Sequence, residues 1–109
     1  MSERLPGLTH LQFLVLGELV DEERQGRFLR EVLARHGVRR SGPAFYQMMA
    51  RLEDQGFVRG AYDQRVVSGQ LIKERRYAMT ASGARELARA RAFYEARLLR
   101  LESTRLRRV

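Results

Sequence analysis

The chain has 109 residues, which is enough for one domain with a modest core and too few for two. Its 21 Lys and Arg outnumber its 13 Asp and Glu, for a net charge of +8, so nucleic acid is the favoured partner and an anionic membrane surface the second. There is no cysteine, which excludes disulfides, thiolate metal sites and a cysteine nucleophile.

The N-terminal residues 1–8 predict a flexible lead-in, because Pro6 and Gly7 interrupt them and no apolar run of signal-peptide length is present. No later stretch approaches the roughly 20 apolar residues that span a bilayer. We therefore expect a cytoplasmic protein.

The first helix is predicted to begin at Thr9, with Gln12 three residues later in the capping-box pattern. The run Phe13–Val20 that follows is apolar on almost every side. It could form a strand, but the cap and the length favour a helix. A helix buried all round needs cover from the C-terminal helix or from a second subunit, which makes Leu14 a candidate dimer contact.

A second, amphipathic helix is predicted from about Gln25 to His36. Before it, Asp21–Arg24 predicts a polar turn, and Gly37 ends the helix. Residues 38–40 are then predicted to form a short extended link, which is long enough for little more than a single β-bridge residue.

The third helix has both ends marked, because Ser41 can cap its N-terminus, Pro43 falls in the first turn and Gly56 can end it. Its apolar residues lie on one face at i, i+3, i+4 and i+7. The opposite face carries small residues, amide and hydroxyl groups and cations. Such a face could enter a DNA major groove, and the alternative is a face that only meets water.

After Gly56 the hydrophobic period changes to two, which predicts strands over 57–62 and 75–79. A reversal at Ser68-Gly69 would pair Val66 with Leu71 and Gly60 with Tyr77. One face would then carry, as its buried set, Val58, Tyr62, Tyr77 and Met79. The hairpin tip is predicted to project beyond the core.

The last helix is predicted to begin at Thr80 and to run for roughly 25 residues, or about 40 Å, longer than a core of this size. Its stripe of apolar residues, interrupted by Arg91 and Arg105, is best buried by a second copy, which predicts a twofold dimer. Phe93 is expected to point back onto the first helix. The stripe consists of Leu87, Tyr94, Leu98 and Leu101.

The element order is that of a mainly α winged helix-turn-helix with a small β-hairpin, and three linked motifs resemble the PadR family of bacterial transcriptional regulators. These motifs are Ser41 to Tyr46, the helix exit Leu52-Glu53-Asp54-Gln55-Gly56-Phe57-Val58, and Arg76-Tyr77-Ala78-Met79-Thr80-Ala81-Ser82-Gly83. The resemblance implies a homodimeric repressor that binds a near-palindromic operator. It divides the chain into the lead-in, a DNA-binding domain over 9–80 and a dimerisation helix over 81–109.

The resemblance also assigns roles to single residues. Tyr46 is similar to a tyrosine that reaches the DNA backbone, and Arg75 and Arg76 occupy basic positions at the base of the wing. Tyr94 lies where an aromatic residue lines an apolar effector space in some members. The wing departs from the family because it is longer and carries Val66, Val67, Leu71 and Ile72.

The cations around the third helix and the hairpin predict phosphate contacts, which supply most of the salt-sensitive affinity. Gln47 is the candidate for base readout, since an amide can pair bidentately with adenine. The full set of predicted DNA-binding residues is Arg39, Arg40, Ser41, Tyr46, Gln47, Arg51, Arg65, Lys73, Arg75 and Arg76.

No grouping of residues predicts a catalytic, metal or cofactor site, so we expect a protein that is not an enzyme. Two other functions remain open. A winged helix can also serve as an adaptor that docks polymerase or a sigma factor, here through the apolar wing tip. A basic protein can also bind nucleic acid without sequence preference.

Overall fold

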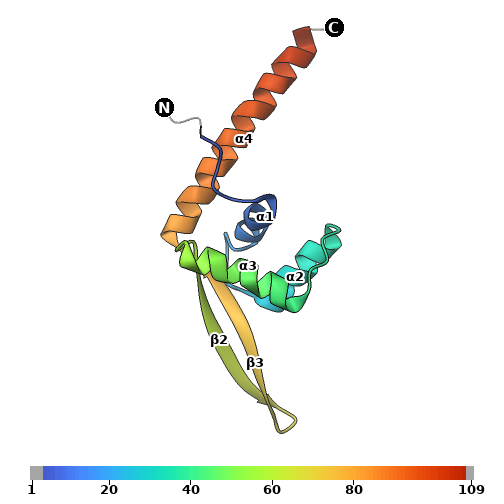
Figure 1. Ribbon diagram of the computed structural model, residues 1–109, viewed down its shortest axis with the longest axis vertical. Helices are drawn as coiled ribbons and strands as arrows, with labels where there is room; N and C mark the ends of the chain where they lie inside the picture. Colours follow the sequence, from blue (N-terminus) through green and yellow to red (C-terminus); the bar gives the residue numbers. More distant parts are fainter. Residues whose placement is uncertain (1–3, 108–109) are drawn as a thin grey trace.

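The computed structural model describes residues 4–107 and the side chains of residues 4–103. The molecule is elongated, with extents of 66 × 29 × 23 Å. Two elements project from a small helical centre in opposite directions, the β2–β3 hairpin at one end and α4 at the other (Figure 1). No described helix is both long enough and apolar enough to cross a bilayer.

The first helix, α1 (His10–Glu18), has the predicted capping box. The Gln12 backbone N–H donates to Thr9 Oγ1 at 3.1 Å, and the Thr9 N–H donates to Gln12 Oε1 at 3.1 Å. Val15 and Leu16 are buried in the core. This helix therefore has the start that the sequence predicts, and α4 supplies part of its cover.

The second helix, α2 (Gly26–Arg35), is preceded by a two-residue strand, β1 (Arg24–Gln25), that the sequence analysis did not predict. β1 pairs with β3 through Arg24 opposite Tyr77 and Gln25 opposite Arg76. The predicted polar turn is right for residues 21–23 and wrong for Arg24, and the 38–40 link, where we placed the bridge residue, contains no strand. Two residues are too few for the sequence to show the alternating pattern of a strand. The pairing depends on the open edge of β3, which lies more than 50 residues later in the chain.

The third helix, α3 (Gly42–Asp54), is confirmed with its predicted caps. The Ala44 N–H donates to Ser41 Oγ at 3.2 Å, and Gly56 has a positive φ of 79° just after the helix. Its inner face fills the centre of the core with the predicted residues Phe45, Met48, Met49 and Leu52.

The hairpin consists of β2 (Val58–Val67) and β3 (Gln70–Met79), and the sheet order is β1-β3-β2. Its register is the predicted one, with a turn at Ser68 and Gly69, whose φ angles are 53° and 78°. Val58 and Tyr77 are buried as predicted. Tyr62 is 64% exposed, contrary to the prediction, because it lies beyond the end of the core on the projecting part of the hairpin.

The last helix, α4 (Ala81–Arg107), has 27 residues. It is joined to α3 by Thr80, whose hydroxyl donates to the Gly56 carbonyl at 2.6 Å and accepts from the Gly83 N–H at 3.0 Å. A Cβ at Gly83 would lie 2.1 Å from the Phe57 carbonyl oxygen, so only glycine allows this approach. Leu8 of the lead-in is buried, and the Gly7 N–H donates to Glu86 of α4 at 3.2 Å.

Candidate nucleic-acid interface

The outer face of α3 is accessible along its whole length. Gln47, Ala50 and Arg51 are exposed, and so are Arg39 and Arg40 in the link before the helix. The link is held by Arg30 of α2, whose guanidinium donates to the Arg40 carbonyl at 3.1 Å. The sequence analysis missed this positioning role of Arg30, because it depends on how α2 packs beside the link.

Ser41 and Tyr46 both have a structural role at the start of α3. Ser41 accepts the capping hydrogen bond from Ala44. The Tyr46 ring stacks on Phe45 with centroids 5.0 Å apart, and it also packs on Gly26, where a Cβ would lie 2.9 Å from a ring carbon. Tyr46 keeps 37% of its surface exposed, so its ring is held in place and still faces outward.

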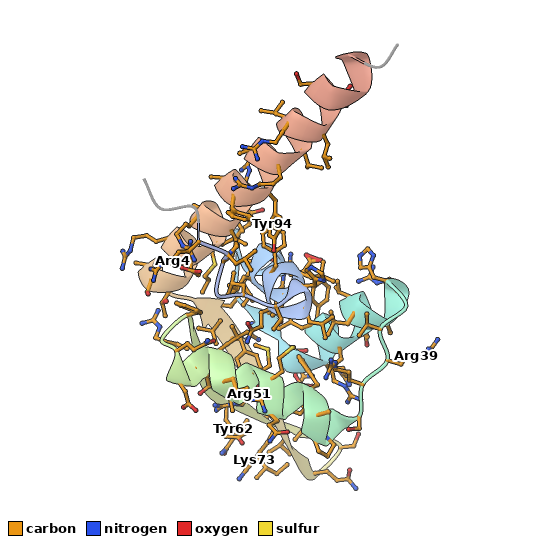
Figure 2. The ribbon with its side chains drawn as sticks, turned by 45° about the horizontal axis from the view of Figure 1, so that its top comes forward. Arg4, Arg39, Arg51, Tyr62, Lys73 and Tyr94 are labelled. Carbon is orange, nitrogen blue, oxygen red and sulfur yellow. The ribbon has the colours of Figure 1, made fainter. Side chains whose placement is uncertain are left out.

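A groove of about 460 Å³ separates α3 from the hairpin. Figure 2 labels Arg51 on α3 and Tyr62 and Lys73 on the hairpin, all at the end of the molecule opposite α4. The helix and the hairpin therefore present one surface, with the groove between them. The groove is lined by Tyr46, Ala50, Glu53, Tyr62, Lys73, Arg75 and Tyr77.

Arg75 lies inside this groove and is paired with an acid of the same chain. Its Nη2 lies 2.7 and 2.9 Å from the two carboxylate oxygens of Glu53. Partial burial lowers the pKa of Arg75, but the hydrogen bonds to Glu53 and Tyr77 more than offset this, so the pKa is raised. Burial raises the pKa of Tyr77 to about 12, and the guanidinium of Arg75 beside it acts in the opposite direction.

Two more of the predicted cations are paired within the hairpin. Arg76 Nε donates to Asp63 at 2.5 Å, and this hydrogen bond raises the pKa of Arg76. Arg65 lies 3.2 Å from Glu74, which also accepts from Gln25. These contacts hold the hairpin together and tie it to the start of α2.

The structure thus divides the seven predicted cations into two groups. Arg65, Arg75 and Arg76 have acidic partners. Within residues 4–103, no ion pair involves any of the others, which are Arg39, Arg40, Arg51 and Lys73. The second group supplies positive charge around the exposed face of α3 that is not already neutralised.

The predicted dimer contacts also divide into two parts. Leu87 of the stripe and Leu14 of α1 are half-buried against the core of the same chain. Leu98 is 64% exposed and Leu101 66% exposed, on the part of α4 that extends past the core. Arg91, one of the two interruptions, pairs with Glu95 at 2.8 Å, whereas the Arg105 side chain lies outside the described residues.

Tyr94, and not Phe93, is the aromatic residue of α4 that meets α1, so the expectation for Phe93 was wrong. The Tyr94 and Phe13 rings meet edge-on with centroids 6.1 Å apart, while the Phe93 ring centroid lies 4.1 Å from the guanidinium carbon of Arg97. Adjacent residues of a helix point in directions about 100° apart, and the sequence pattern did not show which of the two aromatic residues faces α1. Tyr94 lines a mostly apolar pocket of about 410 Å³ with Leu8, Phe13 and Leu98.

Comparison with known proteins gives likenesses at the level of structure. No protein-family model and no curated protein matches the chain. A PadR family transcriptional regulator from Eggerthella lenta is similar at 26% identity with a TM-score of 0.62, over 84% of this chain and 78% of that one. A putative transcriptional regulator from Thermoplasma acidophilum is similar at 23% identity with a TM-score of 0.62, over 91% and 90%.

A third likeness is to PadR of Bacillus subtilis, whose structure is a complex with operator DNA. The identity is 20% and the TM-score 0.58, over 73% of this chain and 46% of that one. These likenesses, together with the four helices, the hairpin and the long last helix described above, confirm the winged-helix fold predicted from the sequence.

Proposed function

We propose that this chain, which has a PadR-like winged-helix fold, is a sequence-specific DNA-binding transcriptional regulator that acts as a homodimer. The observation that carries the proposal is the exposed face of α3, where Gln47 and Arg51 lie near Arg39 and Arg40, and none of these three arginines has an ion pair among residues 4–103. An α-helix with such a face fits the major groove, where base edges are distinguishable. The neighbours are regulators, which favours a role without catalysis.

Each predicted DNA-binding residue outside the ion pairs has a role in this proposal, while Arg65, Arg75 and Arg76 are engaged with acids of the same chain. The unpaired cations Arg39, Arg40, Arg51 and Lys73 contact phosphates and set the position of the duplex. Gln47 contacts a base edge, and adenine is the base that matches its amide. Tyr46 meets the backbone from its fixed place beside Gly26, and Ser41 presents the start of α3.

The exposed half of α4 is the proposed dimer contact, through Leu98 and Leu101 with Tyr94 beside them. Two copies joined in this way would present two α3 helices to two half-sites of a near-palindromic operator. Residues 9–80 then form the DNA-binding domain and residues 81–109 the dimerisation helix. Binding of this kind at an operator that overlaps a promoter would make the protein a repressor.

The apolar pocket between α1 and α4 is the proposed effector site. Its lining by Leu8, Phe13, Tyr94 and Leu98 suits a small apolar molecule that would release the protein from its operator. The pocket adjoins the proposed dimer contact, since Leu98 belongs to both.

The test is selection of bound sites from a random duplex pool, followed by gel shifts on the best site. Gln47→Ala and Arg51→Ala should each weaken binding at moderate salt. Arg85→Ala on the exposed surface of α4 removes the same charge as Arg51→Ala and should leave binding unchanged. If the two α3 variants bind like the wild type, or if no sequence is enriched, the proposal is wrong.

A second function, an adaptor for another protein, is favoured by one observation. The hairpin tip exposes Val66 at 70% and Leu71 at 59%, although apolar side chains are not needed for phosphate contacts. An adaptor would bind its protein partner, and its DNA affinity would be weak, would depend on salt concentration and would not depend on DNA sequence.

A further inference from the structure

Three side chains meet where the hairpin leaves the core. Arg75 of β3 pairs with Glu53 in the last turn of α3, and its guanidinium carbon lies 4.7 Å from the Tyr62 ring centroid on β2. The side chains of Arg75 and Glu53 are only 24% and 28% exposed, so water screens this pair less than a surface pair. One helix and both strands of the hairpin are joined at this point.

The backbone of β2 lies directly under this ion pair at Gly60. A Cβ at Gly60 would lie 2.6 Å from Glu53 Oε1 and 2.7 Å from Arg75 Nη2. The φ of Gly60 is not positive, so a larger residue here is opposed by space and not by backbone conformation, and the ends of the Glu53 and Arg75 side chains would have to shift to admit a Cβ. The sequence therefore keeps room for the pair to sit against the strand.

Among the ion pairs of residues 4–103, that of Glu53 with Arg75 is the one that joins α3 to the hairpin. The pairs at Asp63 and Glu74 act within the hairpin or toward α2. The angle between α3 and the hairpin thus depends on this contact more than on any other charged contact described.

We propose that Glu53, Arg75 and Tyr62, seated on Gly60, form a clamp that fixes the wing at a set angle to α3. Arg75 is then a positioning residue and not a phosphate contact. The tip lies five residues beyond Tyr62, or about 17 Å along the strand. A tilt of about 15° at the clamp would move the tip by about 4 Å, roughly one base-pair step of DNA. The part of this inference that concerns DNA rests on the proposed function.

The first experiment needs no DNA and measures amide hydrogen exchange in the hairpin. Arg75→Gln and Glu53→Gln should each speed exchange at residues 62–74 by about tenfold, as expected for loss of one charged hydrogen-bonded pair, and leave α2 unchanged. Gly60→Ala should have the same effect because its methyl group displaces the pair. Gly17→Ala on α1, where a Cβ meets open space, is the matched control. Unchanged exchange in Arg75→Gln and Glu53→Gln would overturn the clamp.

The second experiment measures affinity for the selected operator against salt concentration. Removing the Glu53 carboxylate should tighten DNA binding if charge alone matters, whereas the clamp predicts that Glu53→Gln weakens it several-fold. Arg75→Gln should weaken binding without reducing the salt dependence. A phosphate contact would instead lower the slope of log affinity against log salt by about 0.9.

The charge-swapped double variant, Glu53→Arg with Arg75→Glu, keeps the net charge of the protein. Under the clamp, Glu53→Arg should raise affinity more in the Arg75→Glu background than in the wild type, whereas a phosphate contact at Arg75 would give equal gains in the two backgrounds. If the wild type selects no DNA sequence, the proposed function fails, while the exchange experiment still decides whether the clamp exists.

Discussion

The hairpin and α4 both extend past the core and both expose large apolar side chains, but they are attached to the core in different ways. The hairpin is tied at its base by ion pairs to α3 and α2, through Arg75 with Glu53 and Arg27 with Glu74. The outer half of α4 is the continuation of a helix whose first half is packed in the core, with Leu87 and Ala90 inside. Salt should therefore weaken the ion pairs of the hairpin more than it affects the attachment of α4, although Val58 and Tyr77 keep the base of the hairpin in the core.

The kind of exposed surface differs in the same way. Near the tip, Val66 and Leu71 share a face of the hairpin with Gln64 and Lys73. The polar members of this face suit a hydrated, charged partner. On α4, Leu98 and Leu101 form an apolar ridge three residues apart, which suits a copy of the same helix. The proposed function thus assigns the two ends of the molecule to two different partners.

The largest expected effect comes from breaking the α4 end. Leu98→Asp combined with Leu101→Asp should give a monomer near 12.7 kDa by sedimentation or light scattering, because charge is placed on the proposed dimer contact. Operator affinity should fall by about a hundredfold or more, since two half-sites no longer act together. Leu71→Asp at the other end is the control and should keep the dimer. A wild-type chain that is already monomeric at micromolar concentration would contradict the assignment.

The next effect concerns the exposed face of α3. Gln47→Ala should lose about 1–3 kcal/mol of discrimination at one base pair of each half-site, because a bidentate amide contact is removed. The measurement is binding to the selected operator and to variants of it at each position. The salt dependence should stay the same, since glutamine carries no charge. A uniform loss over all sequences would argue against base readout by Gln47.

A smaller effect is expected at the hairpin tip. Lys73 has no ion pair among the described residues, so Lys73→Ala should lower the salt slope of binding by about 0.9 and leave sequence preference unchanged. Titrations at several salt concentrations measure the slope. Arg85→Ala on α4 is the control and should leave the salt slope unchanged. An equal decrease in Arg85→Ala would contradict the assignment of the DNA contact to the hairpin end.

The smallest effect tests how the packed half of α4 is held. The hydrogen bond from Arg89, and then that from the Gly7 N–H, lower the pKa of Glu86. A lowered pKa in the folded state means that the stabilisation is present above the ordinary carboxyl pKa and is lost as pH falls through the lowered value. Glu86→Gln should cost less than about 1 kcal/mol at neutral pH. Thermal unfolding should show this difference disappearing in acid.

Local signals predicted most of the fold. The caps at Thr9 and Ser41 act within three residues, and the turn at Ser68-Gly69 fixes the register of the whole hairpin. That register also contains the pairs of Arg76 with Asp63 and Arg65 with Glu74, which are diagonal neighbours across the strands. Those two pairs were therefore available from the sequence, although both arginines are among the predicted DNA-binding residues.

The remaining features depend on contacts that no local pattern encodes. The strand β1 exists because the edge of β3 is open beside Arg24 and Gln25. The pairing of Glu53 with Arg75 depends on how α3 packs against the hairpin, and spacing along the chain carries no sign of it. For the same reason the sequence identified Gln47 as exposed but gave no sign that Arg75 is paired.

The joint at Thr80 has a consequence for the spacing of operators. One hydroxyl links the end of α3 to the start of α4, and Gly83 lies against the Phe57 carbonyl, so the joint leaves little freedom. In a dimer, such joints would hold the two α3 helices at one separation and one rotational phase. One inserted base pair turns a half-site by about 35°, so an operator lengthened at its centre by one pair should be bound far more weakly than one whose flanks are lengthened.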